Sequence, residues 1–101
     1  MRNEPVNLID LMPTFLDIAG AQERLPLDGR RLMGLLRGTD TQNWEALSEY
    51  HSQGAHEPCF MIRRGKFKYV YIHGYESQLF DLEADPGEWH NLAGRLEYQV
   101  V

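Results

Sequence analysis

Towards its C-terminal end the sequence reads Gln78-Leu79-Phe80-Asp81-Leu82-Glu83-Ala84-Asp85-Pro86-Gly87-Glu88-Trp89-His90-Asn91-Leu92-Ala93-Gly94. Residues 78–82 predict a strand that runs into a turn at Asp85-Pro86-Gly87. Pro86 fixes φ near the value that the second turn position needs, and the Asp85 side chain can accept hydrogen bonds from turn amides. Asn91 can act as a further local cap. The carboxylates of this stretch lie across a turn, with no nucleophile and no evident base beside them.

Three further strands are predicted upstream, because apolar, aromatic and β-branched residues alternate with polar ones. They are Ala46–His51, Cys59–Arg63 and Phe67–His73. The connections are short, and Arg64-Gly65-Lys66 is typical of a tight hairpin. Consecutive strands with short connections pair antiparallel, so we expect an antiparallel sheet of about four strands in residues 45–94.

The N-terminal part has a helical pattern instead. Apolar residues recur at helical spacing in Leu11–Ala19, and Gly20 follows as a residue suited to the left-handed end of a helix. We expect Asp10 to be the N-cap, because Pro13 then falls in the first turn, where its missing N–H costs no helical hydrogen bond.

A turn at Asp28-Gly29 and a short helical segment ended by Gly38 complete the helical part of the chain, residues 1–38. Residues 1–101 therefore predict one small α+β domain. We expect a small antiparallel sheet in residues 45–94 with the N-terminal helix packed on it.

Composition excludes several classes of function. The net charge of −5 argues against general nucleic-acid binding. The single cysteine cannot form an internal disulfide, and no apolar run approaches the length of a membrane span. The N-terminus lacks the apolar core of a signal peptide, so we expect a cytoplasmic protein. No two of the four histidines have the spacing of a zinc site, and we predict no catalytic and no metal-binding residue in this chain.

Several segments resemble the sulfatase family, in the family's order. They are Val6–Gly20 with its Asp-x-x-Pro-Thr motif, the segment from Asp28-Gly29 to Gly38, Ser48-Glu49-Tyr50-His51, Met61-Ile62-Arg63-Arg64-Gly65, and the Leu-Phe-Asp-Leu, Asp-Pro-x-Glu and Asn-Leu series of residues 79–92. The residues that mark the family are Asp10, Pro13, Gly20, Asp28, Gly29, Asp81, Asp85, Pro86, Glu88 and Asn91. The sequence departs from the family pattern at Arg31, where serine is usual, and at Gly34, where proline is common. The segments at 48–51, 57–59 (Glu57-Pro58-Cys59) and 61–65 together are most similar to choline-sulfatase-like members.

The resemblance implies that catalysis and structural support belong to different parts of the whole enzyme. It identifies this chain as similar to the C-terminal subdomain of sulfatases, whose larger α/β domain carries calcium and a formylglycine nucleophile. We expect no cofactor in this chain. The chain would then be a C-terminal fragment, catalytically silent alone, of an enzyme that hydrolyses sulfate esters, with choline sulfate as the candidate ester. Its partner would be the catalytic domain or a second copy of itself.

Two points from the resemblance concern single residues. The position of His51 in the family pattern implies that His51 and the loop after it border the substrate mouth of the whole enzyme. The Cys59-x-x-x-Arg63 spacing is similar to the Cys-x-Pro-x-Arg motif that becomes formylglycine, but Met61 replaces the proline and the segment predicts a strand. We therefore expect Cys59 to be a buried thiol without catalytic function.

An alternative function stays open on the sequence alone. The chain can be an independent protein-interaction or oligomerisation module. Such a module would use the aromatic strand face of Phe67, Tyr69 and Tyr71, or the apolar face of the N-terminal helix, against its partner.

Overall fold

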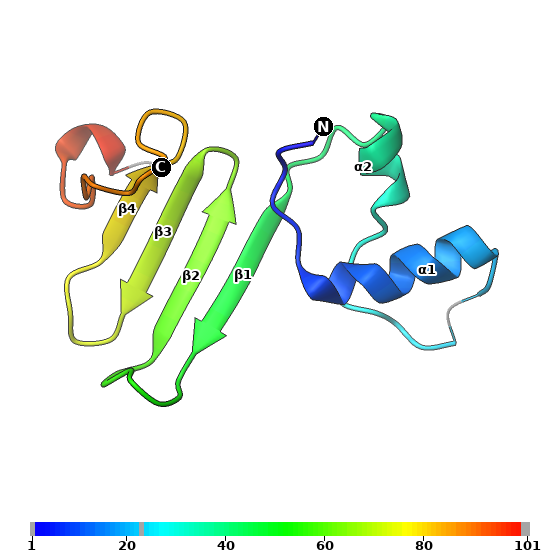
Figure 1. The fold of residues 1–101 in the computed structure, drawn as a ribbon, viewed down its shortest axis with the longest axis horizontal. Helices are drawn as coiled ribbons and strands as arrows, with labels where there is room; N and C mark the ends of the chain where they lie inside the picture. Colours follow the sequence, from blue (N-terminus) through cyan, green and yellow to red (C-terminus); the bar gives the residue numbers. More distant parts are fainter. Residues whose placement is uncertain (1, 23, 100–101) are drawn as a thin grey trace. The chain divides into compact units, whose positions relative to one another are not determined.

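The computed structural model describes residues 2–22 and 24–99 of the chain. They belong to two compact units, Met1–Trp44 and Glu45–Val101 (Figure 1). The helices α1 and α2 lie in the first unit and a four-stranded sheet lies in the second. The α+β class and the antiparallel sheet are confirmed. The packing of the helix on the sheet stays a prediction.

The first unit contains a 3-10 turn, η1 (Leu8–Asp10), and the helices α1 (Leu11–Ala19) and α2 (Met33–Arg37). The bounds of α1 are those that the apolar spacing predicts. Gly20 and Gly38 end the two helices in left-handed conformation, with φ of 67° and 76°. A residue with a Cβ would be strained at both positions, which explains why the helices stop there.

The prediction that Asp10 caps α1 is only partly correct. Asp10 immediately precedes α1, but its side chain does not cap the helix. Asp10 itself has helical dihedral angles, φ −75° and ψ −14°, and makes no capping hydrogen bond. The helical path begins earlier, after the extended residue Asn7, because η1 forms a hydrogen bond of 3.1 Å from the Asp10 N–H to the Asn7 carbonyl. Pro13 still lies in the first turn of α1, where it is fully buried.

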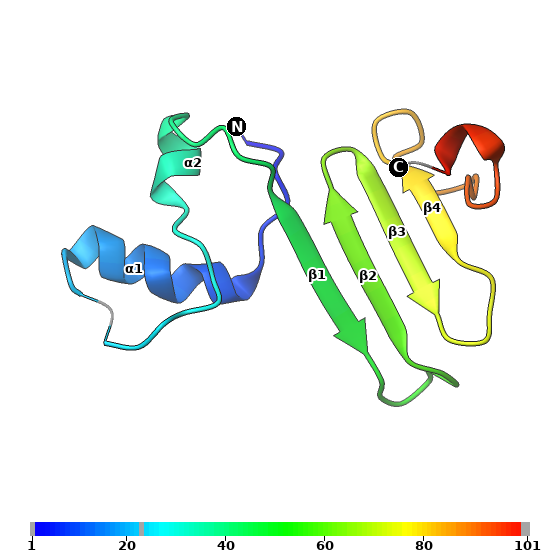
Figure 2. The same ribbon diagram turned by 180° about the vertical axis from the view of Figure 1, so that it is seen from behind.

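The sheet of the second unit consists of β1 (Glu45–Tyr50), β2 (Cys59–Arg64), β3 (Phe67–Ile72) and β4 (Gln78–Asp81). Each strand pairs antiparallel with the next, in the order β1-β2-β3-β4 (Figure 2). All four predicted strands are present, and their ends differ from the prediction by one residue at most. A second 3-10 turn, η2 (Leu96–Tyr98), follows the sheet.

The strand register separates the side chains of the sheet into two faces. Phe60 pairs with Glu49 on one side and Tyr71 on the other, and Ile62 pairs with Leu47 and Tyr69. Because side chains alternate along a strand, these residues share one side of the sheet. We call it the aromatic face, and its members are Leu47, Phe60, Ile62, Phe67, Tyr69, Tyr71 and Leu79. The opposite face contains Ala46, Ser48, Met61, Arg63, Lys68, Val70 and Phe80.

The buried cores are small in both units. Leu79, Phe80 and Leu92 are the buried apolar side chains of the second unit, and Leu35 and Trp44 are those of the first, together with Pro13. Large apolar side chains stay exposed on α1, where Met12 is 60%, Phe15 61% and Ile18 64% exposed. The first unit therefore carries apolar surface that its own residues leave uncovered.

Candidate functional site

A buried carboxylate organises the first unit. Asp10 is 6% exposed, and its two carboxylate oxygens accept N–H hydrogen bonds from Asn7 at 2.9 Å and Arg30 at 2.7 Å. Arg30 lies far along the chain from Asp10. The carboxylate thus ties the segment that follows Asp28-Gly29 to the start of α1. We call this arrangement the Asp10 clasp.

Thr14 and Gly29 complete the Asp10 clasp. The Thr14 hydroxyl donates to the Asp10 carbonyl at 2.6 Å and accepts the Leu32 N–H at 2.9 Å. A Cβ at Gly29 would lie 2.0 Å from the Ile9 carbonyl oxygen, so only glycine allows this backbone approach. The Asp-x-x-Pro-Thr motif and the glycine of Asp28-Gly29 therefore form one structural contact. Asp28 itself is exposed.

A second carboxylate closes the turn after β4. Asp81 is 6% exposed and accepts the N–H groups of Glu83 at 3.0 Å and Ala84 at 3.1 Å. Its other oxygen receives Lys66 from the β2–β3 turn at 2.9 Å. The Lys66 hydrogen bond and the turn amides lower the pKa of Asp81, and the same hydrogen bond to Asp81 raises the pKa of Lys66. The pair holds two turns of the sheet together.

Asp85 organises the loop that Pro86 begins. Its carboxylate accepts the N–H groups of Trp89 at 3.1 Å and His90 at 2.8 Å, and the His90 amide is the main reason that the pKa of Asp85 is lowered. Glu88 has a φ of 55°, unusual for a residue with a Cβ, and its carboxylate pairs with Lys68 of β3. These acidic groups bind amides and lysines of their own unit.

Asn91 fastens the returning chain to β4. Its side-chain oxygen accepts the Leu79 N–H at 3.0 Å, and its amide nitrogen donates to the Ser77 carbonyl at 3.1 Å. Next to it, the Leu92 N–H donates to the Leu79 carbonyl at 2.8 Å. Asn91 and Leu92 thereby satisfy the backbone N–H and carbonyl of Leu79 on the edge of β4 that pairs with no described strand.

His51 follows β1 directly and is exposed. Its Nε2 lies 3.3 Å from the Glu49 carboxylate, and its ring meets Phe60 edge-on with the ring centroids 5.2 Å apart. Phe60 in turn lies 6.3 Å from the Tyr71 ring. An exposed carboxylate and three aromatic rings therefore gather at one end of the aromatic face. We call Glu49, His51, Phe60 and Tyr71 the His51 cluster. Sequence reasoning proposed His51 alone, because its companions follow from the register of β1, β2 and β3.

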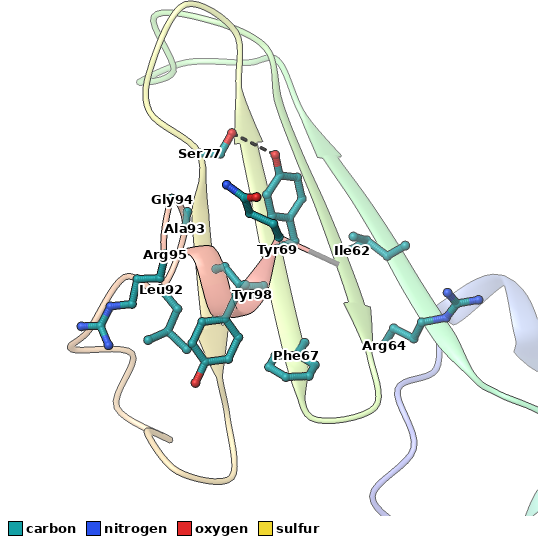
Figure 3. Close-up of a pocket in the computed structure, with 12 residues that line it drawn as sticks. Ile62, Arg64, Phe67, Tyr69, Ser77, Leu92, Ala93, Gly94, Arg95 and Tyr98 are labelled. Atoms are coloured by element: carbon teal, nitrogen blue, oxygen red, sulfur yellow. Dashed lines mark hydrogen bonds between the residues drawn. The ribbon is translucent and has the colours of Figure 1, made fainter. Parts of the chain in front are cut away.

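A pocket of about 490 Å³ opens on the other part of the aromatic face, where residues 92–99 fold back over β3 and β4 (Figure 3). Phe67 and Tyr98 meet edge-on at 6.2 Å along one wall. The Tyr69 hydroxyl donates to Ser77 at 2.9 Å at the other end. The sequence gives no signal for this pocket, because its walls come from segments that only the fold brings together.

The described residues contain no cluster of three or more His, Cys, Asp and Glu side chains that could hold a metal ion. Cys59 is half-buried in β2, and its Sγ donates to the Glu57 carbonyl at 3.3 Å. None of the helices within residues 2–22 and 24–99 is long and apolar enough to cross a membrane. The cytoplasmic location stays a prediction.

Known proteins are similar to this chain in sequence and in fold. The family described as N-sulphoglucosamine sulphohydrolase, C-terminal, matches residues 1–101. Choline-sulfatase of Rhizobium meliloti (strain 1021) is 41% identical over 92 residues, which cover 88% of this chain and 18% of that protein. Arylsulfatase K of Xenopus laevis is 37% identical over 108 residues, which cover 94% of this chain and 20% of that protein. The solved structure of a 2-O GAG sulfatase superposes with a TM-score of 0.73 and 34% identity, over 88% of this chain and 20% of that one. The chain thus spans about a fifth of the length of these relatives.

Proposed function

The chain belongs to the family of N-sulphoglucosamine sulphohydrolase C-terminal domains, and we propose that it is the catalytically silent C-terminal domain of a sulfate-ester hydrolase. The observation that carries the proposal is the family match over residues 1–101 of a chain that spans about a fifth of its relatives. The family-marker residues support it, because Asp10, Asp81, Asp85 and Asn91 bind backbone groups of their own unit.

The nucleophile and the metal of such an enzyme belong, in this proposal, to its larger part. The family pattern implies calcium and a formylglycine residue. The residues described in this structure do not fit either group, because they contain no suitable donor cluster and Cys59 lies half-buried in a β-strand. We assign no step of the reaction to this chain.

The exposed side of α1 supports a catalytic domain as the partner. Met12, Phe15 and Ile18 follow one another at a spacing of three, so they lie on one broad side of the helix, and each is at least 60% exposed. Burying about 300 Å² of this apolar surface would contribute roughly 7 kcal/mol before the costs of association. We infer that the larger part of the enzyme covers this side of α1.

Mixing experiments test this partner. The chain would be combined with choline-sulfatase of Rhizobium meliloti from which the corresponding segment has been removed. We expect a complex in size-exclusion chromatography and recovery of choline sulfate hydrolysis. Phe15→Asp on α1 should prevent both, whereas Leu36→Asp, at an equally exposed apolar residue of α2, should not. A Phe15→Asp chain that restores hydrolysis as well as the unmodified chain would contradict the docking of α1.

The His51 cluster supports choline sulfate as the ester. A quaternary ammonium group is attracted to aromatic faces and to a carboxylate, and the cluster presents both beside His51. An anionic sugar sulfate would be repelled by Glu49. We therefore propose that His51 and Glu49 border the substrate mouth.

The corresponding test compares two substrates in the mixed enzyme. We expect Glu49→Gln and His51→Ala to raise KM for choline sulfate several-fold and to leave KM for an uncharged aryl ester of sulfate nearly unchanged. His56→Ala, in the exposed loop between β1 and β2, is the matched control. Equal effects on both substrates would remove the cluster from substrate recognition.

The independent interaction module remains a second candidate, and the exposed part of the aromatic face favours it. Leu47 is 61%, Phe60 40% and Tyr71 42% exposed. A module of this kind should form a defined oligomer at micromolar concentration without a catalytic domain. Light scattering that reports a monomer would exclude self-association.

A further inference from the structure

Arg63 lies in β2 on the opposite face of the sheet, and no residue within 2–22 and 24–99 supplies a counter-ion to it. The residue is half-buried, and its Nε is buried without a hydrogen-bond partner. No described residue forms an ion pair or a hydrogen bond with it. The buried Nε–H is costly, because it gives up hydration without gaining a hydrogen bond. The structure therefore leaves one donor of the Arg63 guanidinium unsatisfied.

The neighbouring arginine shows the contrast. Arg64, one residue further along β2, points to the aromatic face, is more exposed, and pairs with Glu45 at 3.3 Å. Surface pairs of this kind contribute little to stability. The exposed Arg64 thus has a carboxylate partner, whereas the half-buried Arg63 has none among the described residues.

The strand register adds a second positive charge beside Arg63. Lys68 of β3 is its direct partner, and directly opposed side chains have Cβ atoms about 5 Å apart. Like charges in this position destabilise a sheet. Glu88 neutralises Lys68 through their ion pair, so Arg63 accounts for a net positive charge at the centre of the opposite face.

We propose that Arg63 receives a carboxylate from the catalytic part of the sulfatase, which makes the opposite face of the sheet a second docking surface. The inference rests on the proposed function. This contact goes beyond the proposed function because it is polar, lies on a different unit from α1 and requires an acidic side chain on the partner. The occupant is a carboxylate because a planar guanidinium offers paired donors that match it.

The first test uses the chain alone, so it does not depend on complex formation or activity. Arginine Nε–H signals would be followed by ¹⁵N NMR while sodium acetate is added, with sodium chloride at equal ionic strength as the reference. We expect a saturable shift of the Arg63 signal in acetate and only small shifts for Arg64 and Arg95. An Arg63 signal that moves no more than that of Arg95 would overturn the proposal. Sulfate acting at much lower concentration than acetate would also overturn it, because the site would then belong to an inorganic anion.

The second test measures the complex with the truncated choline-sulfatase. Removing one member of a buried charge pair costs enough to weaken binding by about thirtyfold or more, so Arg63→Gln should raise the Kd by at least that factor. Arg64→Gln is the matched control and should leave the Kd within about twofold. The amide spectrum of Arg63→Gln verifies its fold. An unchanged Kd for Arg63→Gln would refute the contact, while loss of binding by Phe15→Asp alone would leave the proposed docking of α1 in place.

Discussion

The two units use a buried aspartate in different ways. Asp10 accepts an N–H from Arg30, a residue that is distant in the chain, and so holds two segments of the first unit together. Asp81 accepts amides two and three residues away and also binds Lys66 of the β2–β3 turn, while the sheet register already pairs the strands on either side. The buried carboxylate therefore joins two distant segments in the first unit, whereas in the second unit it reinforces turns that the strand pairing brings together.

The difference follows from what joins the segments of each unit. The first unit buries Leu35, Trp44 and Pro13 but has no strand pairing among its described residues, so side-chain hydrogen bonds such as those of Asp10 tie its segments together. The second unit buries Leu79, Phe80 and Leu92 and also has four hydrogen-bonded strands. Loss of a polar contact should accordingly cost more in the first unit.

The largest effect is expected at Gly29. Gly29→Ala would place a Cβ 2.0 Å from the Ile9 carbonyl oxygen, and the backbone must move apart to relieve the clash. Because that movement also breaks the contacts of Asp10 and Thr14, we expect a loss on the order of 3 kcal/mol in the free energy of unfolding. Urea denaturation followed by circular dichroism measures it. Gly34→Ala, where the nearest heavy atom is 3.4 Å away, should be close to neutral.

Removal of the Asp10 carboxylate should have the next largest effect. Asp10→Ala leaves the Asn7 and Arg30 N–H groups without their acceptor, at a cost of about 2 kcal/mol. The same denaturation experiment applies. Asp17→Ala removes an exposed carboxylate that pairs with Arg31 at 3.9 Å and should cost well under about 1 kcal/mol. Equal costs for the two substitutions would show that the Asp10 clasp does not organise the first unit.

Asn91 provides the corresponding test in the second unit. Asn91→Ala removes the acceptor for the Leu79 N–H and the donor to Ser77, and we expect a loss of about 1 kcal/mol. Hydrogen exchange of the Leu79 amide should become faster, because that amide loses its partner. Glu76→Ala, a substitution in the exposed turn before β4, should leave the exchange rate unchanged. A loss larger than that of Asp10→Ala would reverse the comparison between the units.

The smallest effect is a dependence of the stability of the second unit on pH. The pKa values of Asp81 and Asp85 are lowered by hydrogen bonds, so their contribution is complete above the unfolded aspartate pKa of about 3.9 and is lost as the pH falls through their folded pKa values. The pKa of Lys66 is raised, so its contribution is lost as the pH rises through its folded pKa, above the unfolded value of about 10.4. Asp81→Asn should weaken both dependences, as urea midpoints measured from acid to alkaline pH would reveal. Unchanged profiles would contradict the importance of the Lys66–Asp81 pair.

Local sequence signals predict the elements of both units but not their polar contacts. Helix α1 and the four strands follow from spacing, glycine positions and alternation, which act within a few residues. The acceptor function of Asp10 depends on Arg30, and the partners of His51 depend on the pairing of β1 with β2. That no described side chain pairs with Arg63 likewise becomes visible only when the strand register and the burial of its Nε are known. Interactions between distant residues decide these features, and no local pattern contains them.

We propose that this domain supports a sulfatase without performing chemistry itself. The most direct test is to incubate the purified chain with choline sulfate and calcium, and to measure released sulfate against a heat-treated sample. We expect equal, background release from both samples. Saturable release by the unheated chain, persisting after repurification to a single species, would contradict it.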